Sequence, residues 1–258
     1  KVATSWQVSR FLAQKDQSKS IYLKLRRMWS ADLLESFRVS SGSRASMPVY
    51  YMLSKNGLKA LEERGMYDDN FINNYPQANT LFSWGLFNHE SQVTELASME
   101  AKNKSANFDI TFKGELRSGS YDFRSEKNSE VFTPDYTALY TVSEREFCIY
   151  SEFERTVKSR EAMGRKIERY ISYLSPEERK QSTLRFIFQT PSMEQSFWLN
   201  IIANNAAVLQ KLKIVTTNML LLEKSEQFLE PVYASEKTVK LTKQGRLGVD
   251  TRERVKLF

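Results

Sequence analysis

The sequence has very little cysteine and histidine, and these two shortages limit its chemistry. Cys148 is its only cysteine and His89 its only histidine. One cysteine excludes a disulfide framework and a cysteine-based zinc site. One histidine excludes metal sites that need several imidazoles. Any metal must therefore be held by carboxylates, which favours a hard ion such as Mg²⁺ or Mn²⁺.

The sequence also lacks long apolar runs. No stretch of about 18 apolar residues, the length of a membrane span, occurs. The first ten residues lack the apolar segment of a signal peptide. We therefore expect a cytoplasmic protein that does not insert into a membrane. The chain of 258 residues is 41% hydrophobic and 12% aromatic, which is typical of a globular protein with a core.

The positive charge is concentrated near the start of the chain. Of the 38 basic and 31 acidic residues, 12 and 5 fall within residues 1–64, so this segment carries the whole net charge of +7. Residues 236–258 form a second basic segment, with 7 basic and 3 acidic groups. Clustered basic side chains are typical of proteins that bind phosphates, which makes DNA the expected partner.

The first 65 residues have the pattern of a winged helix-turn-helix domain. We predict helices at 5–13 and 18–29, a hairpin of strands 34–40 and 48–53 around a serine-rich tip, and a helix at 55–64. In that fold the second helix enters the major groove and the wing contacts the backbone. The expected DNA contacts are the basic side chains of this helix and wing: Lys19, Lys24, Arg26, Arg27, Arg38 and Arg44. The alternative is a small helical adaptor that binds no nucleic acid.

Residues 66–87 read as an irregular connection, so we expect a second domain over residues 88–258. Helices are predicted at 88–103, 159–174 and 193–212, and strands at 108–116, 121–124, 130–142, 146–155, 184–190 and 214–222. The strand at 146–155 is apolar on both faces and is expected to be central. The predicted fold class is α/β (α+β), with a mixed sheet and helices against it.

Acidic residues recur on two neighbouring strands of this predicted sheet. Pro134-Asp135 lies on one strand, and Glu152 and Glu154 share one face of the next. Such carboxylates repel one another unless a divalent cation neutralises them. Lys166 on the following helix is the candidate partner for a phosphate, and Glu90 is a further acidic candidate. Each motif alone is more often structural, and their order is what points to metal-dependent phosphodiester cleavage.

This order resembles the PD-(D/E)xK nuclease fold, in which an acid on the first helix, the Asp of Pro-Asp and a strand Glu bind metal. More narrowly, the chain resembles the replication-relaxation family, which contains the MobC-type relaxases of mobilisable plasmids. The resemblance covers about residues 5–225. Its motifs are Tyr51-Met52-Leu53-Ser54-Lys55-Asn56-Gly57, His89-Glu90, Pro134-Asp135, Glu152-Phe153-Glu154-Arg155, and Lys166 with Tyr170.

The resemblance implies a relaxase that nicks one strand at a plasmid transfer origin, with double- and single-stranded DNA and a coupling or accessory relaxosome protein as partners. It implies Asp135, Glu152 and Glu90 as metal ligands, Glu154 as an assisting acid, and Lys166 at the phosphate. Either Tyr170 or water would be the nucleophile. The nuclease pattern expects lysine where Glu154 stands, so either Lys166 takes that role or the site is degenerate.

Two other functions stay open at this point. The first is a non-catalytic DNA-binding protein, such as a replication initiator or a relaxosome accessory factor with a degenerate nuclease fold. The second is a transcriptional regulator whose second domain binds a small effector. An acidic cluster without a clear apolar pocket argues against the regulator.

Overall fold

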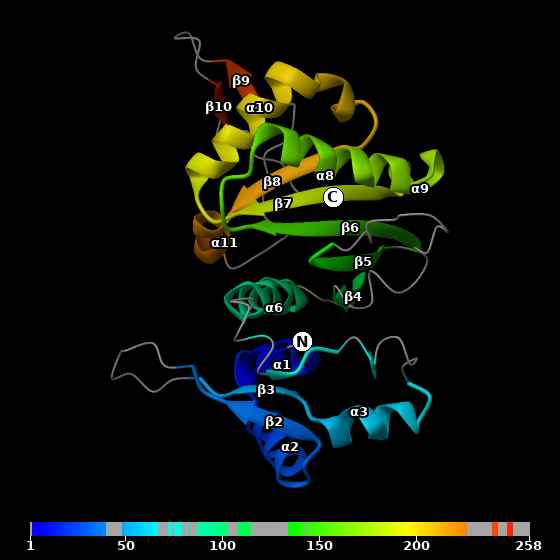
Figure 1. Ribbon diagram of the computed structural model, residues 1–258, viewed down its shortest axis with the longest axis vertical. Helices are drawn as coiled ribbons and strands as arrows, with labels where there is room; N and C mark the ends of the chain where they lie inside the picture. Colours follow the sequence, from blue (N-terminus) through cyan, green and yellow to red (C-terminus); the bar gives the residue numbers. More distant parts are fainter. Residues whose placement is uncertain are drawn as a thin grey trace. The chain divides into compact units, whose positions relative to one another are not determined.

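The computed structural model describes residues 2–39, 48–66, 72–73, 75–78, 81, 87–102, 108–114, 134–142, 144–225, 239–241 and 247–249. The chain divides into two compact units, Lys1–Lys104 and Ser105–Phe258 (Figure 1). The first combines helices with a small antiparallel sheet, and the second has a five-stranded mixed sheet with helices. The predicted mixture of helices and sheets is confirmed at this level.

Serine and threonine side chains begin the helices of the first unit. Thr4, Ser18 and Ser54 precede α1 (Ser5–Ala13), α2 (Lys19–Ser30) and α3 (Lys55–Glu62), and each accepts a hydrogen bond from a backbone N–H of the first turn. Such caps satisfy donors that have no partner within the helix. The predicted starts of these three helices are confirmed.

The small sheet separates two groups of buried side chains. Its strands β1 (Ala3–Thr4), β3 (Tyr50–Leu53) and β2 (Leu34–Phe37) are antiparallel and lie in that order. Because successive strand residues point to opposite faces, Leu34, Tyr51 and Leu53 pack with Ile21 and Leu25 of α2. The residues of the other face pack with α6 (Phe87–Ala101): Phe37, Tyr50 and Met52, together with Phe87 and Val2.

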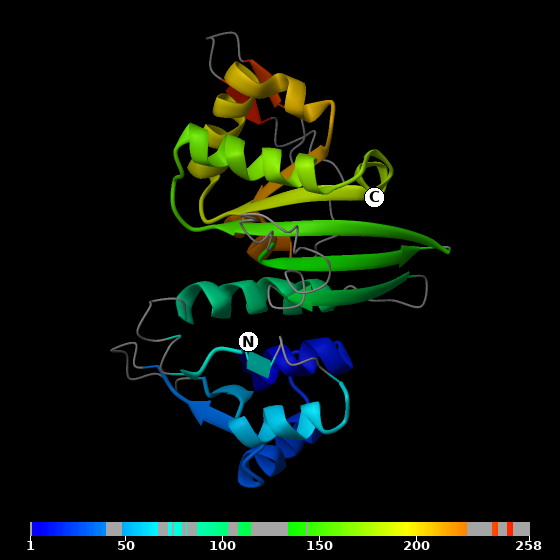
Figure 2. The same cartoon turned by 45° about the vertical axis from the view of Figure 1, so that its right-hand side comes forward.

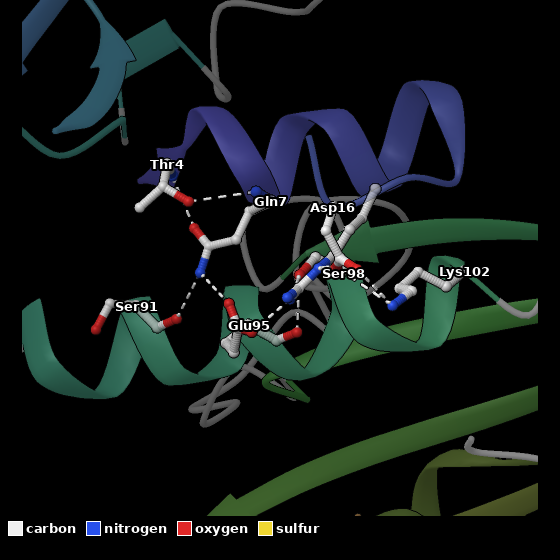
Figure 3. Close-up of polar contacts among 8 residues, drawn as sticks. Thr4, Gln7, Asp16, Ser91, Glu95, Ser98 and Lys102 are labelled. Atoms are coloured by element: carbon white, nitrogen blue, oxygen red, sulfur yellow. Dashed lines mark hydrogen bonds and ion pairs between the residues drawn. The ribbon is translucent and has the colours of Figure 1, made fainter. Parts of the chain in front are cut away.

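Polar side chains also join α1 to α6 (Figure 3). Gln7 donates to a carboxylate oxygen of Glu95 at 2.8 Å, and Arg10 donates to Glu95 and to Asp16. Lys102, just after α6, binds Asp16 at 3.0 Å. Helix α6 therefore groups with the first unit, whereas the sequence analysis placed residues 88–103 in the second.

The five strands of the second unit lie in the order β4-β5-β6-β7-β8. Their bounds are Phe108–Gly114, Tyr136–Val142, Arg145–Glu154, Ser182–Phe188 and Lys213–Asn218. The pairs β4–β5 and β5–β6 are antiparallel, and β6–β7 and β7–β8 are parallel. Strand β6 is central, as its apolar sequence predicted.

Two helices cover one face of the parallel part of the sheet (Figures 1 and 2). They are α8 (Arg160–Tyr173) and α10 (Pro191–Leu209), which supply Ile167, Tyr170 and Trp198 to a core with Leu184 and Phe186 of β7. This packing fixes α8 against β6 and β7, and the candidate site depends on that placement. A separate antiparallel pair is formed by β9 (Val239–Leu241) and β10 (Leu247–Val249).

Several details differ from the predicted elements. Strand β5 begins at Tyr136, so Pro134 and Asp135 precede the strand on which they were predicted, and β2 and β3 are shorter than the predicted strands 34–40 and 48–53. Helix α9 (Pro176–Gln181), which Ser175 caps, was not predicted. The strand predicted at 214–222 ends at Asn218, whose side-chain oxygen accepts from the backbone N–H of Leu221 and so starts α11 (Met219–Ser225). The strand predicted at 121–124 and the start of the one predicted at 130–142 lie outside the described residues. None of the helices in the described part of the chain has the length and hydrophobicity to cross a bilayer.

Candidate functional site

An acid–lysine cluster lies at the carboxyl end of β6. Glu152 and Glu154 are two residues apart on this strand, so both point to the face covered by α8. They are 5% and 2% exposed. Ser159 caps the start of α8, and Lys166 and Tyr170 of this helix contact the carboxylates of the strand. The structure thus brings together four of the predicted residues: Glu152, Glu154, Lys166 and Tyr170.

Lys166 binds both carboxylates. Its Nζ lies 2.6 Å from Oε2 of Glu152 and 2.8 Å from Oε1 of Glu154. The hydroxyl of Tyr170 donates to the other oxygen of Glu152 at 2.6 Å. Lys158, which the sequence analysis did not single out, lies 2.8 Å from Oε2 of Glu154. Two lysines therefore balance two nearly buried carboxylates, as buried charges require.

Asp135 lies beside this cluster, immediately before β5. Tyr136 pairs with Ser151 in the antiparallel register, so Asp135 stands opposite Glu152. Its Oδ2 accepts a hydrogen bond of 2.6 Å from the backbone N–H of Phe153. The structure therefore places the aspartate of Pro134-Asp135 next to the glutamate pair.

Burial and charge set the protonation of the cluster. Burial raises the pKa of Glu152 to about 7, the charge of Asp135 adds to this rise, and Lys166 and Tyr170 oppose it. Burial acts to lower the pKa of Lys166, but the charges of Glu152 and Glu154 outweigh it and raise that pKa overall. Burial, followed by the charge of Glu152, raises the pKa of Tyr170 well above its usual value. At neutral pH the ammonium stays charged and the phenol keeps its proton.

The raised pKa of Glu152 predicts a pH-dependent stability that Glu152→Gln should remove. The pKa is about 7 in the folded chain against 4.5 for the free group. The stabilising proton is therefore fully bound below 4.5 and is lost as pH rises through 7. We expect the unfolding free energy of the wild type to fall by on the order of 3 kcal/mol over that interval relative to the variant.

Urea unfolding from pH 4 to 8 in EDTA measures this difference. Glu168→Gln, which changes an exposed glutamate on α8, serves as the control and should follow the wild type. Equal pH slopes for Glu152→Gln and wild type would show that the pKa of Glu152 is the same in the folded and the unfolded chain, and would contradict the raised value.

A buried arginine lies in the same sheet and was not singled out from the sequence. Arg185 of β7 is 0% exposed, and its Nη2 donates to the hydroxyl of Tyr136 at 2.8 Å and to that of Ser151 at 2.7 Å. Ser151 precedes Glu152, so Arg185 lies on the opposite face of the sheet from the cluster. The sequence feature that could have indicated this buried group is a single arginine among the apolar residues of β7.

The cluster offers carboxylate oxygens, which are the ligands that a hard divalent ion prefers. Mg²⁺ binds through one or two carboxylates and completes its shell with water and substrate phosphates. Asp135 and Glu152 supply two such groups. Within the described ranges, no three His, Cys, Asp or Glu side chains form a group that could hold a metal by themselves. Glu90, the third predicted ligand, lies on α6 in the first unit, where it is 8% exposed.

The predicted DNA contacts lie on the surface of the first unit. Four are exposed on α2, namely Lys19, Lys24, Arg26 and Arg27, and Arg38 is exposed just after β2. Arg44 lies outside the described residues. In contrast to Arg10 and Lys102, which bind Asp16, none of these five forms an ion pair with a described acidic residue. Their charge is therefore not neutralised by the described part of the chain.

Comparison with known proteins adds no relative. No family model matches the chain, and it shows no significant similarity to a curated protein or to a solved structure.

Proposed function

We propose that this chain is a cytoplasmic DNA-binding protein that cleaves one DNA strand with a divalent metal ion. The observation that carries the proposal is the placement of Lys166 between Glu152 and Glu154, beside Asp135, at the end of the central strand. Phosphodiester cleavage needs carboxylates that hold a metal and a cation that faces the phosphate. The cluster supplies carboxylates and an ammonium of the types that these two roles need, and a purely structural ion pair does not need the third carboxylate.

The first unit would bind the DNA as a winged helix-turn-helix domain. Helix α2 carries four exposed basic residues and no acidic one, and β2 and β3 follow it as an antiparallel pair. In that fold a basic second helix enters the major groove. The unneutralised charge of α2 supports this role.

Each residue of the cluster has a separate task in the proposed reaction. Asp135 and Glu152 would hold Mg²⁺ or Mn²⁺, which supplies an activated water and polarises the phosphoryl oxygen. Lys166 would offset the negative charge that develops on the phosphate. Tyr170 is buried and donates to Glu152, so we assign it the positioning of that carboxylate and leave the attack to water. Lys158 would balance Glu154 while Lys166 contacts the substrate.

The resemblance to the replication-relaxation family supports the finer proposal. In that reading the chain is a plasmid mobilisation relaxase with a PD-(D/E)xK nuclease-like second unit. The winged helix would bind the transfer origin, and a coupling protein or an accessory relaxosome protein would join the complex. The reaction would be a nick in one strand of that origin.

A nicking assay tests the proposal. Supercoiled plasmid carrying the DNA that flanks the gene is incubated with the full chain and Mg²⁺, Mn²⁺ or EDTA. We expect open circles only with metal, and a loss of about 10³-fold or more for Asp135→Asn. Asp109→Asn, on the exposed surface of β4, is the matched control and should retain the wild-type rate.

A second function is favoured by one observation. Both oxygens of Glu152 are occupied, by Lys166 and by Tyr170, and no three potential ligand side chains are grouped in the described residues. This arrangement suits a non-catalytic DNA-binding protein, such as a replication initiator or a relaxosome accessory factor. Tight DNA binding without nicking in either metal would select that function and reject cleavage.

A further inference from the structure

Two tyrosines and two arginines meet on the α2 side of the small sheet. Tyr22 and Arg26 are four residues apart on α2, so they are neighbours on its surface. Tyr51 of β3 packs against the buried residues of α2 and pairs with Ser36 of β2. Arg38 follows Ser36 by two residues and so starts on the same side. We call Tyr22, Arg26, Arg38 and Tyr51 the tyrosine–arginine cluster.

The charges of Arg26 and Arg38 both act on the phenol of Tyr51. Burial and the neighbouring Tyr22 raise the pKa of Tyr51, whereas Arg26 and Arg38 act to lower it. The two arginines come from different elements, yet both influence the same phenol. Tyr51, Arg26 and Arg38 therefore share the α2 side of the small sheet.

No acid balances these charges in the described part of the first unit. Glu35, the only acidic residue of β2, pairs with Met52 and so points to the other face of the sheet. Neither Arg26 nor Arg38 forms an ion pair with a described side chain. Both arginines are exposed, and Tyr22 is 47% exposed. A solvent-accessible pair of guanidinium groups without a carboxylate is suited to an external anion.

We propose that the tyrosine–arginine cluster binds a single backbone phosphate of duplex DNA. Arginine forks donate in pairs to phosphate oxygens, and tyrosine hydroxyls are frequent donors to the DNA backbone. This inference rests on the proposed DNA binding and adds the residues that fix α2 on the duplex. Attraction between positive charges and the DNA backbone would not require Tyr22 or Tyr51. Their hydroxyls can donate hydrogen bonds to a phosphate oxygen. Arg27 lies about 100° further around α2 and is outside the cluster.

A double-mutant cycle tests this assignment. Binding of the full chain to a 30-base-pair duplex is measured by fluorescence anisotropy in EDTA over a series of KCl concentrations. We expect Tyr51→Phe, which removes only a hydroxyl, to weaken binding about fivefold to tenfold. Arg38→Gln should weaken binding more and reduce the salt slope by about 0.9.

The combinations separate a shared phosphate from independent contacts. In the Arg38→Gln background, Tyr51→Phe should cost less than about twofold, because groups that share one partner are not additive. Arg27→Gln also removes one positive charge, but from a residue outside the cluster. In that background, Tyr51→Phe should still weaken DNA binding as much as it does in the wild type. Equal effects in both backgrounds, or no effect of Tyr51→Phe on wild-type binding, would overturn the assignment and leave DNA binding intact.

Two further arms identify the source of the phosphate. Absence of duplex binding by the wild type would reject the proposed DNA binding together with this site. In the second arm, inorganic phosphate is added in place of KCl at equal ionic strength. Suppose that inorganic phosphate binds the wild type but not Tyr51→Phe, while the wild type and Tyr51→Phe bind DNA equally. The site then takes a free phosphate and not the DNA backbone. Thermal unfolding of each variant checks that the fold is retained.

Discussion

Lys166→Met is expected to lower the rate of plasmid nicking by about 10²- to 10³-fold. Among the described lysines, Lys166 is the one whose ammonium reaches both Glu152 and Glu154, at 2.6 and 2.8 Å, so its loss removes the cation that we assign to the phosphate. Methionine keeps the length and apolar stem that pack on α8. The rate is measured from single-turnover conversion of supercoiled to open circular plasmid at saturating protein.

Lys158→Met is the matched control for that experiment. Lys158 also binds Glu154, but its side chain is 37% exposed and makes no bond to Glu152. We expect Lys158→Met to lower the rate less than about tenfold, because Lys158 is partly exposed and Lys166 still pairs with Glu154. Lys166→Arg should restore part of the activity, because it keeps the charge. Equal losses for Lys158→Met and Lys166→Met would indicate a general effect of charge and argue against a phosphate contact for Lys166.

Arg185→Met is expected to lower the unfolding free energy of the second unit by about 3 kcal/mol or more. The guanidinium of Arg185 is fully buried and donates to Ser151 and Tyr136, so its removal leaves both hydroxyls without this donor. Hydrogen bonds to a charged group are worth about 1.5 to 3 kcal/mol each. Urea unfolding followed by tryptophan fluorescence reports the loss, since Trp198 is buried in the same unit.

Arg185→Met in a Ser151→Ala/Tyr136→Phe background separates two contributions of Arg185 to the unfolding free energy, its hydrogen bonds and its packing. With both hydroxyls absent, Arg185→Met should cost clearly less than it does in the wild type, because fewer polar groups lose a partner. An unchanged cost would assign the stabilising effect of Arg185 to packing or to its other interactions. DNA binding by the first unit should not change in any of these variants.

Local signals in the sequence were sufficient for most of the elements. Ser18 and Ser54 act as the caps that their positions before amphipathic segments predicted, and the amphipathic pattern placed the start of α8 within one residue. The apolar run after Glu146 indicated the central strand, and the Glu152–Glu154 spacing placed both acids on one face. These features depend on neighbours within a few residues, which a single sequence reveals.

Features that depend on distant residues were not predictable in this way. Helix α6 groups with the first unit because Gln7 and Arg10 bind residues about 85 positions later. The buried role of Arg185 depends on Tyr136 and Ser151, which lie on two other strands. In the sequence, Lys158 resembles an ordinary loop lysine. Its contact with Glu154 is seen only in the folded chain. In each case the pattern of one segment does not identify its partner.

The packing of α6 on the small sheet has a consequence for synthesis of the protein. Phe37, Tyr50 and Met52 form an apolar face, and one of its partners, Phe87, is made later than the end of β3 at Leu53. At about 5 to 20 residues per second, this face stays uncovered for roughly a few seconds on each nascent chain. An uncovered apolar sheet face is a surface that chaperones bind and that other nascent chains can pair with. Because α6 follows β3 in the sequence, the first unit can bind chaperones or other nascent chains through this face until α6 emerges.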